Sequence, residues 1–202
     1  SYTFQDANKS YKYLANGKII ELINPTDVYG KLDEEGTMYL RATFKEGYNT
    51  ASTNRLDHLG TAANIKKVII EEPIATQSCY RMFFGLSNLE KIENMKYLHT
   101  ENLTNMEEIF NNLPSLTELD VSRFDTSQVT KGIVLTNCPL VTDLDVSGFD
   151  TSKADIIVIT GFKSLKELDI SGFDTSNATS IAFGSNTRNY TRTHARLIKC
   201  HY

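Results

Sequence analysis

Three stretches of the chain repeat nearly the same residues at a fixed period. Aligned by their first apolar residue, they are LTELDVSRFDTS from Leu116, VTDLDVSGFDTS from Val141 and LKELDISGFDTS from Leu165. The steps between these positions are 25 and 24 residues. Such a period is typical of a solenoid, in which each unit is too small to bury its own apolar face and must stack on its neighbours.

Each repeat contains an alternating segment that predicts a half-buried strand. Leu119 and Val121 alternate with Asp120 and Ser122, so one side should face the core and the other the solvent. The equivalent segments should stack into a short parallel β-sheet on the concave face, with strands about 4.8 Å apart. The predicted core positions are Leu119, Leu144 and Leu168, then Val121, Val146 and Ile170, then Phe124, Phe149 and Phe173.

The remainder of each unit predicts the other side of the solenoid. In NMEEIFNNLPSL (105–116), the spacing of Met106, Ile109, Phe110 and Leu113 predicts a short amphipathic helix. The later stretches KGIVLTNCPL and KADIIVIT are rich in β-branched residues, which favours extended or irregular structure. The fold class predicted is therefore an α/β leucine-rich solenoid.

Three regions are expected along the chain. Residues 1–60 predict an N-terminal β-rich cap, because Asn16-Gly17 favours a hairpin and GTMYLRATF a strand. Residues 61–185 predict about five coils, since LEKIENM and IKKVIIE keep the apolar spacing of the repeat. Residues 186–202 hold four Lys or Arg and no Asp or Glu, and predict either a closing cap strand or a basic contact arm.

Composition removes several classes of function. A net charge of -4 argues against a general nucleic-acid binder, which needs a basic face. No apolar run approaches the length of a membrane helix, so no membrane insertion by this segment is expected. The opening SYTFQDANKS has no signal-peptide pattern. Cys79, Cys138 and Cys200 are widely spaced, which predicts buried or free thiols.

The sequence predicts no catalytic residue, no metal site and no cofactor, so we expect that the chain is not an enzyme. The four histidines are scattered, and none belongs to a short-spaced metal motif. Cys138 lies in NCPL, where a small apolar residue packs well, and no phosphate-binding glycine loop is present.

Acidic side chains recur at one outward position of the predicted strands. Glu93, Asp120, Asp145 and Asp169 occupy this position, flanked by hydroxyls at Thr117, Thr142, Ser122, Ser147 and Ser171. One interpretation is that the carboxylates only keep the sheet face soluble. The other is a partner-binding surface for a protein with a basic patch. The second acidic row, Asp125, Asp150 and Asp174, is assigned to turns.

The motif L-x-x-L-D-[VIL]-S-x-F-D-T-S resembles the BspA-like leucine-rich-repeat proteins of bacterial surfaces. The resemblance covers residues 89–185 well and 61–88 loosely. It implies a cell-surface or secreted protein-binding module of adhesin type, whose partner is a protein of a host or a neighbouring cell. The alternatives are a structural spacer or scaffold within a larger multidomain surface protein, and a glycan-binding module. The partner's identity and the oligomeric state stay open.

Overall fold

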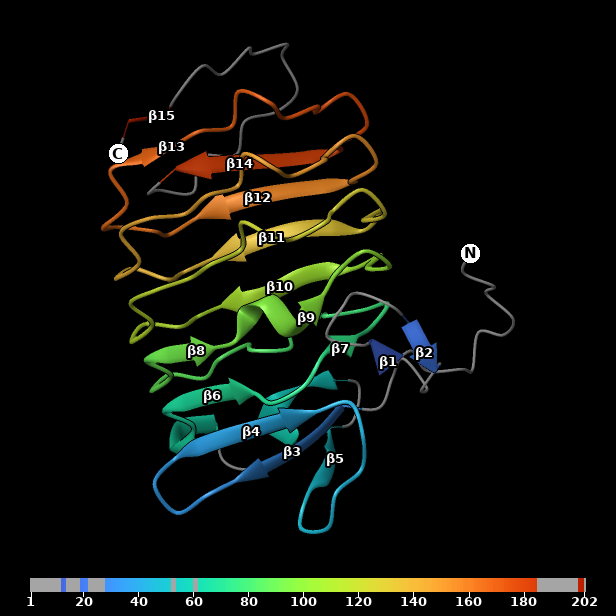
Figure 1. Cartoon of the computed structure of the whole chain (residues 1–202). Coiled ribbons are helices and arrows are strands. Elements are labelled where there is room, and N and C mark those ends of the chain that lie inside the picture. The colour runs from blue at the N-terminus through green and yellow to red at the C-terminus, as the bar shows by residue number, and fades with distance from the viewer. Residues whose placement is uncertain are drawn as a thin grey trace.

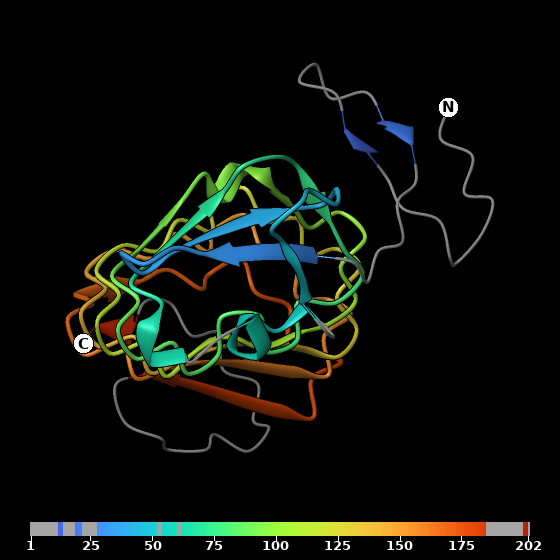
Figure 2. The ribbon, with the colours of Figure 1, turned by 90° about the horizontal axis from the view of Figure 1, so that it is seen from below.

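The protein folds into a β-solenoid of about five coils (Figure 1). The computed structural model describes residues 28–51, 54–59 and 62–184, and the backbone of short strands at 12–13, 19–21 and 200–201. Seen from below, successive coils lie over one another around a common interior (Figure 2). The predicted solenoid is therefore confirmed.

The elements are short strands and single helical turns. The first part of the chain contains β1 (Lys12–Tyr13), β2 (Ile19–Glu21), β3 (Val28–Leu32), β4 (Thr37–Arg41), β5 (Asn49–Ala51), η2 (Leu56–Leu59), η3 (Ala62–Asn64), β6 (Lys67–Ile70) and β7 (Ile74–Ala75). The second part contains β8 (Lys91–Glu93), η4 (Met95–Tyr97), β9 (Leu98–His99), β10 (Met106–Asn111), β11 (Gly132–Thr136), β12 (Ile156–Thr160), β13 (Glu167–Leu168), β14 (Ser180–Gly184) and β15 (Cys200–His201).

Two sheets form the main walls of the solenoid. One has the strand order β5-β3-β4-β6-β8, in which β3 pairs antiparallel with β4 and β5, and β4, β6 and β8 are parallel. The other has the order β10-β11-β12-β14 and is entirely parallel. A smaller parallel pair joins β7 to β9. Each parallel step joins one coil to the next, so the sheets run along the stack.

The helix predicted between 105 and 116 is wrong, because this segment contains strand β10. Glu108 adopts a left-handed conformation with φ of 55°, and the pairing of β10 with β11 shifts between Met106 and Phe110. This bulge changes the side-chain alternation, so Met106, Ile109 and Phe110 are all buried. A bulged strand thereby reproduces the apolar spacing of a helix.

The α/β class is corrected to all-β for the described part of the chain, in which η2, η3 and η4 are single 3₁₀ turns. The predicted concave sheet is corrected as well. The segments at 119–121 and 144–146 are extended but form no assigned strand, and β13 covers only Glu167 and Leu168. The β-branched stretches form the regular ladder instead, as β11 and β12.

The predicted stacking of core residues is confirmed, except that Phe173 is only partly buried against the core. Leu119, Leu144 and Leu168 are at most 7% exposed, and their valine and isoleucine neighbours are buried equally well. An added Cβ would lie 3.8 Å from the Ser122 carbonyl oxygen at Gly148 and 4.0 Å from the Ser147 carbonyl oxygen at Gly172, so the same neighbours recur from coil to coil. All these side chains belong to one core cluster.

A buried threonine in the Asp-Thr-Ser motif links each coil to the next. The Thr126 hydroxyl donates to the Asp150 carbonyl oxygen at 2.9 Å, and the Thr151 hydroxyl donates to the Asp174 carbonyl oxygen at 2.8 Å. Both threonines are 1% exposed. Because an unpaired buried carbonyl is costly, these bonds favour the one-coil register.

The segment before the repeats continues the first wall. Met38 and Leu40 of β4 are fully buried, and β4 pairs directly with β6. Strand β4 confirms the strand expected in GTMYLRATF, and β1 pairs antiparallel with β2 on either side of Asn16-Gly17, a dipeptide outside the described residues. At the other end β15 pairs antiparallel with β13, whereas the rest of the predicted segment 186–202 lies outside the described residues.

A column of left-handed residues ends the strands of the second wall. Asn112, Asn137 and Gly161, which follow β10, β11 and β12, have φ values of 60°, 57° and 77°. The Asn112 amide donates to the Thr136 carbonyl and the Asn137 amide to the Thr160 carbonyl, so the column is bonded from coil to coil. Glycine and asparagine are the residues that adopt this conformation most readily.

We predict that Gly161→Ala destabilises the protein by about 1–3 kcal/mol, because it combines backbone strain with a clash. The new Cβ would lie 2.8 Å from the backbone nitrogen of Asn137. Gly172→Ala is the matched control, since the nearest atom there is 4.0 Å away. Urea unfolding of both variants measures the difference, and equal stability of the two would contradict the proposed strain.

Candidate functional site

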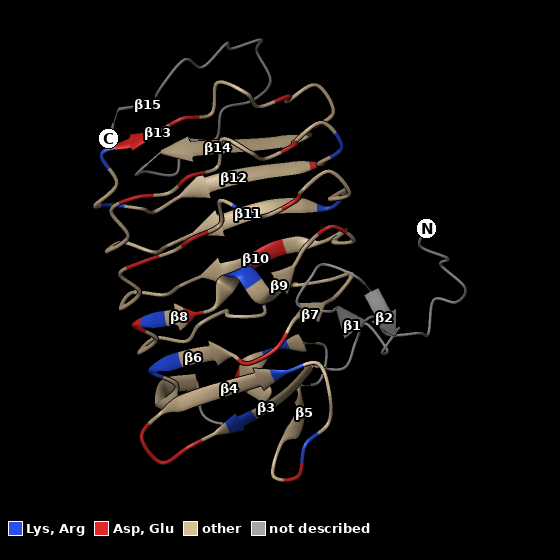
Figure 3. Cartoon of the chain, viewed as in Figure 1, with Lys and Arg blue, Asp and Glu red and all other residues tan. Residues whose placement is uncertain are grey.

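The predicted outward acidic positions lie on the solvent side of three successive coils. Asp120, Asp145 and Asp169 are exposed, while the leucine before each is buried. Two residues earlier a second carboxylate is exposed in each coil. We define the acidic face by these six residues: Glu118, Asp120, Asp143, Asp145, Glu167 and Asp169. Figure 3 shows acidic segments recurring in successive coils of the upper part of the molecule.

The first acidic row, which consists of Asp120, Asp145 and Asp169, also fixes the conformation of the backbone beside it. The amide of Ser122 donates to Asp120 Oδ1 at 3.1 Å, and the amide of Ser147 donates to Asp145 Oδ1 at 3.0 Å. The hydroxyls of the same serines donate to the same oxygens at 2.6 and 2.7 Å. Asp169 accepts the amide of Ser171 at 2.9 Å. These are Asx turns, so Ser122 and Ser147 serve the turn as well as lining the face.

The second row confirms its assignment to turns. Asp125, Asp150 and Asp174 each accept the amide of the serine two residues later, all at 2.9 Å. The two acidic rows therefore share one local chemistry. They differ in place, because each aspartate of the second row directly follows the phenylalanine of its repeat and lies outside the acidic face.

Hydrogen bonds from serines lower the pKa values of Asp145, Asp150 and Asp174. The hydroxyl and amide of Ser147 lower the pKa of Asp145, and this outweighs the smaller opposing effect of the Asp169 charge. Bonds from Ser152 and Ser176 likewise lower the pKa values of Asp150 and Asp174. Hydrogen bonds to the charged form thus offset the repulsion expected between neighbouring coils.

The remaining predicted residues lie in line with the face but have partners of their own. Glu93 of β8 forms ion pairs with Lys67 Nζ at 2.9 Å and Lys91 Nζ at 3.8 Å, and the Lys67 bond lowers its pKa. The Thr117 hydroxyl donates to the Glu90 carbonyl at 3.4 Å, and the Thr142 hydroxyl to Asp143 Oδ2 at 2.9 Å. The negative charge is therefore concentrated in the later coils.

The described side chains of Cys79, Cys138, His58 and His99 have surroundings of their own. Cys79 and Cys138 are buried and free, and burial raises the pKa of each to about 12. His58 lies 3.9 Å from Asp57, and His99 lies 3.2 Å from Glu101. Within the described ranges, no group of three or more His, Cys, Asp or Glu is placed to hold a metal ion. No helix in the same ranges has the length and apolar character of a membrane span.

A stacked β-solenoid with a Leu-x-x-Leu core motif defines a repeat protein. Residues 80–173 match the family model described as the endo-beta-N-acetylglucosaminidase EndoS LRR domain. This match supports a leucine-rich-repeat family for the segment. A search of curated proteins and a search of solved structures each find no match.

We predict that the triple variant Asp145→Asn, Asp150→Asn, Asp174→Asn loses stability less steeply in acid than the parent chain. A carboxylate with a lowered pKa stabilises the fold above its ordinary pKa, and this contribution disappears as the pH falls through the folded-state pKa. Asparagine keeps an acceptor oxygen for the turn but does not titrate there. Melting temperatures measured from neutral to acid pH test this, and parallel curves for the two proteins would refute it.

Proposed function

We propose that this chain is a non-enzymatic protein-binding module of a cell-surface or secreted protein, of adhesin type, and that it engages a basic partner through the acidic face. A leucine-rich-repeat domain suggests a protein-interaction module. The resemblance to BspA-like surface proteins supports the extracellular location and the adhesin role.

The observation that carries the proposal is the repetition of exposed carboxylates in three consecutive coils. Glu118 and Asp120 recur as Asp143 and Asp145, and again as Glu167 and Asp169. Such a surface attracts lysine and arginine side chains and accelerates their encounter at low salt. The Asx turns fix the backbone beside each first-row aspartate, which reduces the conformational entropy lost on binding.

The experiment requires variants that lose negative charge but keep the Asx turns. Asp→Asn substitution retains the Oδ1 acceptor, whereas alanine or lysine would remove it. The test variant is Asp120→Asn, Asp145→Asn, Asp169→Asn. The control is Asp125→Asn, Asp150→Asn, Asp174→Asn, which removes the same number of charges from the second row.

We predict that the first-row variant binds an oligolysine peptide about tenfold more weakly at low salt, since exposed ion pairs contribute about 0.2–1 kcal/mol each. The second-row control should retain most of the affinity, and high salt should weaken binding by both proteins. Calorimetric titration measures the affinities. Equal losses in the two variants would show that only net charge matters and would remove the assignment to the acidic face.

The two alternatives predict other outcomes. A spacer or scaffold would give no affinity in either variant or in the parent chain. A glycan-binding module would use exposed aromatic side chains, of which Phe44 and Tyr80 are examples, and a glycan array would detect it.

A further inference from the structure

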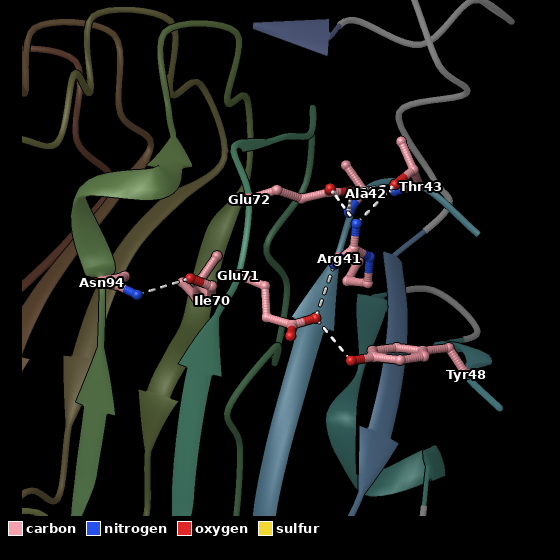
Figure 4. A network of polar contacts seen from close by, with 8 residues as sticks. All are labelled: Arg41, Ala42, Thr43, Tyr48, Ile70, Glu71, Glu72 and Asn94. Carbon is pink, nitrogen blue, oxygen red and sulfur yellow. Dashed lines mark hydrogen bonds and ion pairs between the residues drawn. The ribbon is translucent and has the colours of Figure 1, made fainter. Parts of the chain in front are cut away.

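The loop between β4 and β5, residues 42–48, is held to the first coil by two adjacent glutamates (Figure 4). Glu72 Oε1 accepts the amides of Ala42 and Thr43 at 3.0 and 2.7 Å, and the Thr43 hydroxyl at 2.6 Å. Its other oxygen accepts Arg41 Nη2 at 2.7 Å. One carboxylate therefore binds four donors from three consecutive residues.

The neighbouring glutamate holds the far end of the same loop. Glu71 Oε2 accepts the Tyr48 hydroxyl at 2.7 Å and Arg41 Nη1 at 3.1 Å. Arg41 thus bridges the two carboxylates, and its guanidinium lies 5.9 Å from the Tyr48 ring centroid. The side chains of Arg41, Glu71 and Glu72 are between 22% and 26% exposed, so the network is partly protected from solvent.

Between these two attachments the loop presents its most exposed apolar side chain. Phe44 is 70% exposed, and its ring contacts Tyr29 edge-on at a centroid distance of 5.8 Å. The strands on either side of the loop are held differently, by backbone pairing and by the fully buried Met38 and Leu40. The loop can therefore open while the strands stay paired, because different contacts hold the two parts.

We propose that Glu71 and Glu72 form a carboxylate clamp that closes the β4–β5 loop on the first coil, and that neutralising the clamp opens the loop while β3, β4 and β6 remain paired. The loop is then a conformational device: closed, it holds Phe44 in a fixed position, and open, it releases Phe44 from that position.

The sign of the pH dependence follows from the groups around the clamp. Burial alone would raise the pKa of Glu71, but the bonds from Tyr48 and Arg41, with the nearby Lys45 charge, lower it below the ordinary value of 4.5. Through Glu71, the clamp therefore stabilises the closed loop at neutral pH, and this contribution is lost as the pH falls through the folded-state pKa of Glu71. Burial and the Glu71 bond raise the pKa of Tyr48 to about 12, so the phenol remains a donor throughout this range.

Amide hydrogen exchange on the whole chain tests the proposal through the variant Glu72→Ala. Protection of the Ala42 and Thr43 amides should fall about ten- to a hundredfold at neutral pH, as expected for lost bonds to a charged acceptor. Protection in β6 should not change. The control Glu93→Gln removes a carboxylate from the same sheet, one coil further on, and should leave the loop amides as in the parent chain. Unchanged loop amides in Glu72→Ala would overturn the clamp.

Acid titration of the parent chain provides the second measurement. Protection of the Tyr48 amide, which donates to the Lys45 carbonyl within the loop at the end held by Glu71, should be lost at a higher pH than protection in β4 and β6, after correction for intrinsic exchange. The milder variant Glu72→Gln keeps one neutral acceptor oxygen, so its loop should lie between the parent and Glu72→Ala in protection. Loss of loop and strand protection at the same pH would refute independent opening.

Discussion

The pairing of each coil with the coil above and below is the constraint on which the whole structure depends. A coil of about two dozen residues cannot enclose a core by itself, so its apolar side chains are buried only when the next coil is in register. In the second wall the register is unbroken over five residues from β11 to β12 and again from β12 to β14. The hydroxyls of Thr126 and Thr151 reinforce it from inside.

The sequence predicted the stacking well because stacking is visible as a period. Repetition at 25 and 24 residues identifies equivalent positions, and alternation at 119–122 identifies which side is buried. Burial does not determine hydrogen bonding, however. The L-D-V-S segments alternate like strands, but the Asx turn at each aspartate diverts backbone donors that a sheet would use.

The helix predicted at 105–116 failed for a different reason. Apolar residues at 106, 109, 110 and 113 fit a helical period, and no local rule separates that pattern from a strand with a bulge. The left-handed Glu108 decides it, since it turns Ile109 and Phe110 inward together. Pairing with the strongly β-branched β11 overrides the helical preference of Met and Glu.

The carboxylate clamp formed by Glu71 and Glu72 could not be predicted from the repeat, because the residues that it binds do not recur from coil to coil. Arg41 lies 30 residues before Glu71 and outside the predicted coils, so the repeat gives no sign of this contact. The turns within the later repeats are held by hydrogen bonds between an aspartate and the serine two residues later. This D-x-S spacing is visible in the sequence. The first coil lies beside the segment that precedes the repeats. Its corner is therefore joined to that segment by ion pairs between residues that are far apart in the sequence.

The composition of the acidic face argues that its charge is more than a by-product of turn chemistry. An Asx turn needs only an acceptor oxygen, although a charged acceptor strengthens it. The needs of the turn therefore account in part for the negative charge of Asp120 and Asp145. Glu118 and Asp143 stand two residues earlier and accept none of the described turn amides. Their carboxylates are two of the six on the face and add charge that the turns do not require, and under the proposed function this charge attracts a basic partner.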